Sequence, residues 1–366
     1  MQHLNKHHLN KRRDGWLNTN ATFRVAFIGC GKRAHEHAHG VKADGRLEVV
    51  ALADISEDSA NALNEAFGFG AAVYTDYRRM LDEVKPDIAI ICLWTPLHLP
   101  VFRDCAEAGV RAVLSEKPMA PGWGECLEMA RIAEETGCQL TFSLQRRFAR
   151  GNQTVRRLIR EGRIGRVVRM DLYSPPNLLD CGIHTFDQAM SFMDETPAKW
   201  VLGAVDASET LNWFNVPSES VAAGLVVFRN GVRANIQAGG PDMDIWGGVR
   251  VIGTEGFLEV MWDGEIKGGA VYADPSWKPE VEVTPHAEQM AGYVRHAVDC
   301  LITGEEPEVS YKKALRASEI IYAFYESVRR NARVELPLVE GVTDNPFITM
   351  LQEGRFTAPA EGGKSS

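Results

Sequence analysis

The chain has 366 residues and a formal net charge of −9 at neutral pH, with 45% hydrophobic and 24% charged residues. This length favours two domains, and the composition is that of an ordinary globular protein rather than a disordered one. The acidic balance argues against attraction to nucleic acid or to an anionic membrane surface. No apolar run reaches the roughly 18 residues that a membrane span requires. We therefore expect neither a nucleic acid nor a membrane as a partner.

Seven cysteines are scattered along the chain, odd in number and without a C-x-x-C pair. In a chain of this length, the pattern predicts reduced thiols in a cytoplasmic protein rather than disulfides or a zinc knuckle. Residues 1–21 are polar and basic, and Arg12-Arg13 does not lead into the apolar segment that an export signal needs. We therefore interpret residues 1–21 as a disordered basic extension.

Short apolar runs and helical patterns alternate over roughly 120 residues from Phe23 onward. Such alternation predicts a doubly wound parallel sheet covered on both faces, which we assign to an N-terminal Rossmann domain over residues 22–145. Apolar residues three or four positions apart predict helices at residues 57–67, 100–108 and 123–135. The predicted strands are residues 24–28, 47–53, 87–93, 111–115 and 139–144.

The alternation ends near Leu144, and strand patterns of period two follow. Asn230-Gly231 predicts a tight hairpin turn between two of these strands. We assign residues 146–340 to an α+β domain that binds substrate and forms the oligomer, with a large, mostly antiparallel open sheet, and residues 341–366 to a C-terminal tail. The expected strands are residues 166–173, 199–205, 221–228, 232–237 and 248–252, and the expected helices are residues 149–161, 287–301 and 311–330.

A glycine-rich turn follows the first strand and opens the first helix, with the sequence Gly29-Cys30-Gly31-Lys32-Arg33-Ala34. It fits the pattern G-x-G-x-x-G/A, in which the glycines shape the turn and let a pyrophosphate approach the helix N-terminus. Asp54 ends the second strand, 23 residues after Gly31. A carboxylate there binds the ribose hydroxyls and repels a 2′-phosphate. Together these residues predict an NAD site, with NADP less favoured.

One motif invites a different interpretation. His35-Glu36-His37-Ala38-His39 matches the zinc motif H-E-x-x-H. The two outer histidines, however, lie in the first turns of the helix that is expected to bind phosphate, and no third ligand is evident. We therefore predict no metal site.

Several further motifs, taken in their order and spacing, resemble the Gfo/Idh/MocA family of glucose–fructose oxidoreductase, inositol dehydrogenase and their relatives. The resemblance covers roughly residues 22–340. The matching segments, besides the glycine turn, are Tyr74-Thr75-Asp76-Tyr77, Thr95-Pro96-Leu97-His98, Glu116-Lys117-Pro118, Arg147-Phe148, Asp180-Cys181-Gly182-Ile183-His184-Thr185-Phe186-Asp187, Gly253-Thr254-Glu255-Gly256 and Glu335-Leu336-Pro337-Leu338.

The resemblance implies a role for each matched site residue. Lys117 would contact the reacting hydroxyl near the nicotinamide, His184 would be the general acid/base, and Asp180 would bind substrate or orient the site. The peptide bond before Pro118 is expected to be cis. Further residues implied at the cofactor are Thr95, Pro96, His98 and Glu116, and Arg147 is expected to contact substrate.

The chemistry of alcohol oxidation agrees with this assignment. Hydride leaves for the nicotinamide and the hydroxyl proton needs a base, for which a neutral imidazole with an ordinary pKa of about 6.5 is suited. A neighbouring ammonium such as Lys117 lowers that pKa and stabilises developing alkoxide charge. We therefore expect an NAD-dependent oxidoreductase that acts on a carbinol carbon of a sugar, inositol or related polyol.

Two alternatives stay open from the sequence: an NAD-retaining, redox-assisted glycosidase or epimerase, and a non-catalytic ligand sensor on the same fold. We also expect a homodimer or homotetramer. The exposed face of the second sheet, with Trp200, Val226, Phe228 and Ile236 as candidates, would be a costly apolar patch in a monomer.

Overall fold

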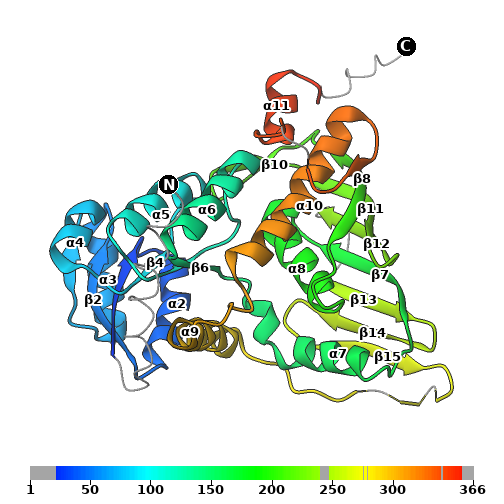
Figure 1. The fold of residues 1–366 in the computed structure, drawn as a ribbon, viewed down its shortest axis with the longest axis horizontal. Helices are drawn as coiled ribbons and strands as arrows, with labels where there is room; N and C mark the ends of the chain where they lie inside the picture. The colour runs from blue at the N-terminus through cyan, green and yellow to red at the C-terminus, as the bar shows by residue number, and fades with distance from the viewer. Residues whose placement is uncertain (1–21, 240–246, 275, 278, 339–340, 357–366) are drawn as a thin grey trace, which may run out of the picture.

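The computed structural model describes residues 22–239, 247–274, 276–277, 279–338 and 341–356. The predicted basic extension over residues 1–21 and the end of the predicted tail lie outside the described residues. Within the described part of the chain, no helix is long and apolar enough to cross a membrane. Two sheets with their own helix layers lie side by side, the first at the left and the second at the right of Figure 1.

The first sheet has six parallel strands in the order β3-β2-β1-β4-β5-β6. Its order reverses between β1 and β4, which creates the switch point outside whose carboxyl edge ligands bind in open α/β sheets. The central strands β4 and β5 are buried throughout because helices cover both faces. The strands are β1 (Phe23–Ile28), β2 (Leu47–Ala53), β3 (Ala72–Tyr74), β4 (Ile88–Ile91), β5 (Ala112–Ser115) and β6 (Gln139–Phe142).

Local chemistry sets the ends of the helices around this sheet. The Ser56 hydroxyl accepts a hydrogen bond from the Ser59 amide at the start of α3, and Gly68 ends that helix in the left-handed conformation. The Asp76 carboxylate caps α4 in the same way. The helices are α2 (Lys32–Lys42), α3 (Glu57–Phe67), α4 (Tyr77–Val84), α5 (His98–Glu107) and α6 (Trp123–Thr136), with a short 3₁₀ turn η1 (Thr95–Leu97) before α5.

The second sheet has eight strands in the order β15-β14-β13-β7-β12-β11-β8-β16. All neighbouring pairs are antiparallel except β7 and β12, so the predicted large, mostly antiparallel sheet is confirmed. Gly231, at φ 85°, makes the predicted hairpin turn. The strands are β7 (Val167–Ser174), β8 (Ala198–Asp206), β11 (Val221–Phe228), β12 (Arg233–Gly239), β13 (Gly248–Gly253), β14 (Gly256–Met261), β15 (Ile266–Val271) and β16 (Val334–Glu335), and β9 (Leu211–Trp213) pairs separately with β10 (Val216–Ser218).

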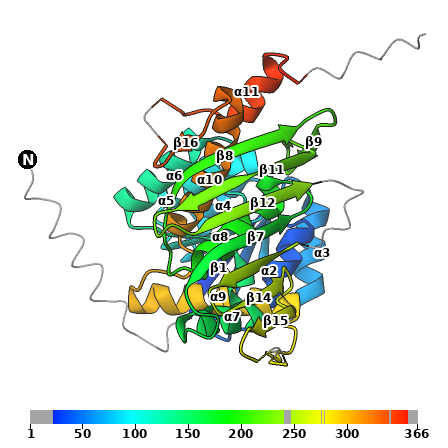
Figure 2. The same cartoon turned by 90° about the vertical axis from the view of Figure 1, so that its right-hand side faces the viewer.

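One face of the second sheet is open, and the other packs against α8 and α10, as Figure 2 shows. Val226, Phe228 and Ile236 are buried, so the prediction that they lie on the open face is wrong. Successive side chains of a strand point to opposite faces of the sheet. An assignment that is wrong by one position therefore places the whole set on the wrong face. Trp200 stays partly exposed, and Leu202 is 46% exposed.

Further helices follow in the chain, of which α10 contacts strands of both sheets. They are α7 (Arg150–Arg160), α8 (Ile183–Ser191), α9 (His286–Thr303), α10 (Tyr311–Arg330) and α11 (Pro346–Gln352), with short helical turns η2 (Gln145–Phe148) and η3 (Leu178–Gly182) before α7 and α8. Helix α9 packs on α2 of the first sheet's layer, at Gly40, where a Cβ would lie 2.9 Å from the carbonyl oxygen of Met290. Part of the predicted C-terminal tail is helical, because α11 buries Phe347 and packs on α10.

Candidate active site

The glycine turn after β1 has the shape that its sequence predicts. Gly29 adopts φ 87°, and a Cβ there would lie 2.4 Å from the carbonyl oxygen of Cys92 at the end of β4, so only glycine fits. At Gly31, a Cβ would meet no atom within 4 Å. Open space thus lies beside the second glycine, at the N-terminus of α2.

That helix end is suited to an anion. No side chain caps α2, and its first turn has no acidic residue but begins with Lys32 and Arg33. Uncapped amides and the helix dipole favour negative charge at this position. Ala34 is buried at the third position of the motif. These residues fit the pyrophosphate of a dinucleotide.

Asp54 stands directly beside this turn. Its carboxylate accepts hydrogen bonds from the backbone amides of Cys30 at 2.7 Å and Ser56 at 2.8 Å. The carboxylate is therefore fixed at the carboxyl end of β2, where a ribose would lie. The next residue, Ile55, is 95% exposed. Ile55 is not among the predicted site residues, although an apolar side chain directly after the strand-end carboxylate is a detectable signal.

Glu116, at the end of β5, lies in a buried ionic network under the turn. His37 Nε2 lies 2.7 Å from its carboxylate and Arg33 Nη2 3.1 Å. Burial alone would raise the pKa of Glu116, but the His37 hydrogen bond and the Arg33 charge hold it well below its usual range. The carboxylate therefore holds Arg33 and α2 against the end of β5, and its predicted contact with a cofactor stays a prediction.

Lys117 reaches across from the first sheet to the second domain. Its Nζ donates to the Asp180 carbonyl oxygen at 2.9 Å and also to the Asp180 carboxylate. Asp180 belongs to η3, a π-helical turn in which the Asn177 side chain accepts a hydrogen bond from the Asp180 amide at 2.7 Å. The Lys117–Pro118 peptide bond is cis, as expected. The structure thus joins Lys117 and Asp180, which lie 63 residues apart.

His184 lies in the first turn of α8, one helical turn after Asp180, and is 3% exposed. Burial lowers its pKa well below the ordinary value, and the positive charges of Arg146 and Lys117 lower it further. Among the described residues, none forms a hydrogen bond with its buried Nδ1 atom. The imidazole is therefore neutral at pH 7 and able to accept a proton.

The first residue of α5, His98, is a buried anchor. His98 Nδ1 lies 3.0 Å from the Pro118 carbonyl oxygen, and Nε2 lies 3.1 Å from the Leu93 carbonyl oxygen. This histidine therefore holds the loop that carries Lys117 and does not itself present a free nitrogen. Pro96 is partly exposed beside Thr95, whose buried hydroxyl has no partner within the described residues.

Phe214, which is not among the predicted site residues, lies on this side of the site. It lies at the tip of the β9–β10 hairpin at φ 51°. Its carbonyl oxygen accepts a hydrogen bond from the Thr95 amide at 3.2 Å, and Lys117 Nζ lies 4.7 Å from its ring centroid. The pair Phe214-Asn215 between two short apolar strands is a weak hairpin signal, too weak to indicate a site.

Arg147 is placed differently from its prediction. Its side chain is 1% exposed, and it donates to both Asp187 carboxylate oxygens at 2.7 Å. It also pairs with Glu195 at 2.5 Å and Glu308 at 3.2 Å. Burial alone would lower the pKa of Arg147, but the carboxylates of Asp187 and Glu195 raise it. With its donors committed inside the protein, Arg147 gives no support to the predicted substrate contact.

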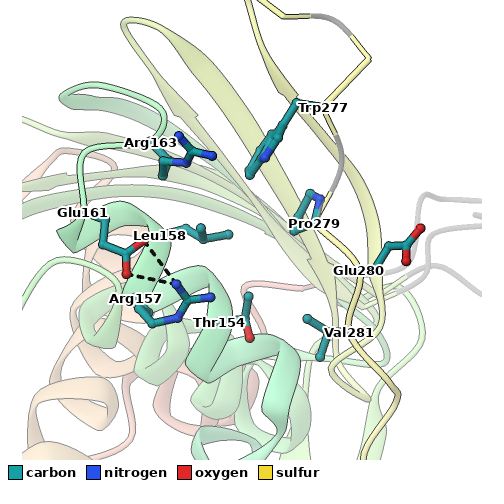
Figure 3. Close-up of a pocket in the computed structure, with 9 residues that line it drawn as sticks. All are labelled: Thr154, Arg157, Leu158, Glu161, Arg163, Trp277, Pro279, Glu280 and Val281. Atoms are coloured by element: carbon teal, nitrogen blue, oxygen red, sulfur yellow. Dashed lines mark hydrogen bonds and ion pairs between the residues drawn. The ribbon is translucent and has the colours of Figure 1, made fainter.

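A hollow of about 490 Å³ lies elsewhere, between α7 and the side chains of Trp277, Pro279, Glu280 and Val281 (Figure 3). The Arg157–Glu161 ion pair, at 2.9 Å, and Arg163, whose guanidinium carbon lies 5.4 Å from the Trp277 ring, line it. None of its lining residues belongs to the cluster around Lys117 and His184. We therefore assign the chemistry to the cluster and not to this hollow.

Comparisons with known proteins agree with the geometry. A model of the oxidoreductase family with an NAD-binding Rossmann fold matches residues 23–144, and a model of the family's C-terminal α/β domain matches residues 156–336. D-apiose dehydrogenase from Paraburkholderia graminis is 27% identical over 363 aligned residues, which cover 91% of this chain and 94% of the relative. D-glucoside 3-dehydrogenase from Escherichia coli is 31% identical, over 47% of this chain and 54% of the relative.

Solved structures share the fold. The WlbA dehydrogenase from Bordetella pertussis, in complex with NADH and UDP-GlcNAcA, has a TM-score of 0.75 at 21% identity and covers 88% of this chain and 100% of that one. A levoglucosan dehydrogenase in complex with NADH and levoglucosan has a TM-score of 0.73 at 18% identity, over 87% of this chain and 100% of that one. With both family models matched over most of its length, the chain belongs to the Gfo/Idh/MocA family and is an oxidoreductase with an NAD-binding Rossmann fold.

Proposed function

We propose that this enzyme transfers a hydride between NAD and a carbinol carbon of a sugar, inositol or related polyol. The observation that carries the proposal is the junction of Lys117 and Asp180, contributed by different domains, one helical turn from the neutral imidazole of His184. This junction lies beyond the carboxyl edge of a Rossmann sheet whose glycine turn fits a pyrophosphate. D-apiose dehydrogenase and two inositol dehydrogenases among the relatives support the substrate class.

The cluster divides the work of oxidation among three side chains. A bound nicotinamide supplies the hydride acceptor. Lys117 donates a hydrogen bond to the substrate oxygen and stabilises its negative charge as the C–H bond breaks. His184 accepts the hydroxyl proton, since its imidazole is unprotonated. Asp180 holds the Lys117 ammonium in place and accepts a hydrogen bond from a neighbouring hydroxyl. In reduction, the same proton returns from His184.

NAD is the proposed cofactor, in preference to NADP. Asp54 would accept hydrogen bonds from both ribose hydroxyls of the adenosine, and its charge would repel a 2′-phosphate. The exposed Ile55 would pack against the adenine. Lys32 and Arg33, the cations nearest the turn, would lie beside the pyrophosphate, although Arg33 is held by Glu116.

A substrate screen tests the proposal. Purified protein with NAD and a panel of aldoses, inositols and alditols is expected to produce absorbance at 340 nm with at least one compound, and much less with NADP. Turnover without net NADH would indicate an NAD-retaining glycosidase or epimerase instead. Saturable binding of panel compounds with no turnover of any kind would indicate a sensor.

We also propose a cytoplasmic enzyme. All seven cysteines are free, and five of them are buried. Free thiols persist in a reducing compartment. Fractionation of the producing cells is expected to place the enzyme with cytoplasmic markers, and recovery with the periplasm or medium would contradict this.

The open face of the second sheet is proposed to form a homodimer or homotetramer contact. Leu202 on β8 pairs in register with the partly exposed Leu225 on β11, and both lie on this face. Exposed leucines on a broad sheet favour association. Light scattering is expected to give a mass of two or four chains, and a Leu202→Glu substitution to reduce it. A monomeric wild-type mass would contradict the proposal.

A further inference from the structure

Arg146 is a buried cation that has no carboxylate partner among the described residues. Its side chain lies in η2, and the residue is 5% exposed. Its guanidinium carbon lies 5.6 Å from the Trp262 ring centroid, and Nη2 donates to the Cys181 sulfur at 3.4 Å. Among the described residues, nothing accepts a hydrogen bond from the buried Nη1 atom. A sulfur and a ring face are weak substitutes for the water that this group lost on burial.

Other cations near the site, the buried Lys117 and Arg147 and the half-buried Arg33, have acidic partners. Lys117 pairs with Asp180, Arg33 with Glu116, and Arg147 with Asp187. Removing a guanidinium from water without such a partner costs several kcal/mol in general. Arg146 therefore stands out as a positive charge that the described protein leaves uncompensated.

The position of Arg146 links this charge to the reaction. Cys181, its contact, directly follows Asp180 and lies three residues before His184. After burial, the charge of Arg146 has the largest effect in lowering the pKa of His184. Asp180 is 8% exposed and Lys117 7%, close to the 5% of Arg146. The residues that the substrate would contact are thus about as buried as Arg146.

We propose that Arg146 binds a carboxylate of the substrate, so that the preferred substrates are sugar acids or polyol acids, such as uronates and aldonates, rather than neutral sugars. This inference rests on the proposed hydride transfer at Lys117 and His184. A guanidinium presents paired N–H donors in a fixed fork that matches the two oxygens of a carboxylate. A bound substrate carboxylate would form an ion pair with the Arg146 guanidinium, which no carboxylate of the described residues provides.

Matched substrate pairs test the inference. Galacturonate is compared with galactose, glucuronate with glucose, and gluconate with sorbitol, each by kcat/KM with saturating NAD. The wild-type enzyme is expected to prefer the acid of at least one pair by 10-fold or more. The Arg146→Gln variant is expected to lose about 100-fold on that acid and little on its neutral partner, because a buried charge pair loses its cation. Arg157→Gln, which removes an exposed cation of α7, is the control and should change neither.

A second variant leaves Arg146 in place. Cys181→Asp puts a carboxylate where the sulfur now accepts from Nη2, and this internal partner is expected to abolish the acid preference while raising the melting temperature. The two variants together separate loss of the anion site from loss of folding.

The outcomes separate this inference from the proposed function. If the wild-type enzyme oxidises the neutral sugars with the same kcat/KM as the acids, hydride transfer stands and the anion site is refuted. If no compound is oxidised, calorimetry of gluconate and sorbitol with the NADH-loaded enzyme decides: selective, Arg146-dependent binding of gluconate supports the site, and equal or absent binding refutes it. Preference for glucose 6-phosphate over gluconate would also overturn it. So would an Arg146→Gln variant that raises only the KM for NAD, since the arginine would then hold the cofactor.

Discussion

Replacement of Lys117 by methionine is expected to lower kcat/KM by about 10³-fold, in the range found when a preorganised donor to a developing oxyanion is removed. Methionine keeps an unbranched side chain of similar size but carries no charge and no donor. The Asp180 carboxylate then loses its ammonium partner, and the substrate oxygen loses the cation that stabilises it. Dinucleotide affinity should change little, because the glycine turn and Asp54 hold the phosphate and ribose elsewhere.

Stopped-flow or steady-state absorbance at 340 nm measures the rate, and quenching of NADH fluorescence measures cofactor binding. Lys312→Met, which removes an exposed lysine that pairs with Glu306 at 3.7 Å, is the matched control. Near-normal turnover in Lys117→Met, with dinucleotide affinity intact, would refute the proposed role of this lysine.

The same variant has a signature in the pH profile. The pKa of His184 is lowered by burial and by the charges of Arg146 and Lys117, so wild-type kcat/KM for oxidation should hold as pH falls to 6.5 and decline only below it. Without the Lys117 charge, protonation of His184 becomes easier. The acid limb of the residual activity should therefore move to higher pH, a shift that a merely misfolded fraction would not produce.

Local signals explain why the Rossmann domain and its dinucleotide site could be predicted from the sequence. The glycine turn, the carboxylate at the end of β2 and the alternation of strands with helices are all short-range patterns, and α3 begins and ends where they predict, at Glu57 and Phe67. The family resemblance brought Lys117, Asp180 and His184 into one hypothesis, and the structure links the first two directly. Whether they catalyse the reaction stays a prediction.

Long-range contacts explain what was missed. Phe214 reaches Lys117 through a hairpin whose strands have only three residues each, too short for a period to show. Which side chains of β11 are buried depends on which face of the strand packs against α10. An alternating pattern shows that the strand has two faces but not which of them meets the helix. Arg146 and Arg147 are adjacent and chemically identical, yet within the described part of the chain Arg147 pairs with several carboxylates and Arg146 with none. Their partners come from residues 35 to 161 positions away, which no local pattern encodes.

The Arg147→Met variant is expected to lose about 3–5 kcal/mol of unfolding free energy, the cost of leaving a buried charge without its partner. Asp187 is buried on α8 and would lose both of its short hydrogen bonds from the guanidinium. Glu195 and Glu308, which are more exposed, would regain part of their hydration and contribute less. Urea unfolding followed by tryptophan fluorescence measures the change, and Arg157→Met, which breaks an exposed pair, should cost under about 0.5 kcal/mol.

A double substitution separates the ion pair from simple packing. If the loss arises from the stranded carboxylate, Arg147→Met combined with Asp187→Leu should recover much of the stability, because two apolar side chains can replace a buried pair at little cost. A double variant as unstable as the sum of the singles would show that shape, not charge, is what Arg147 supplies. Asp187 also lies one turn after His184 on α8. The single variant should therefore lower kcat through displacement of the imidazole, and the double variant should restore it together with stability.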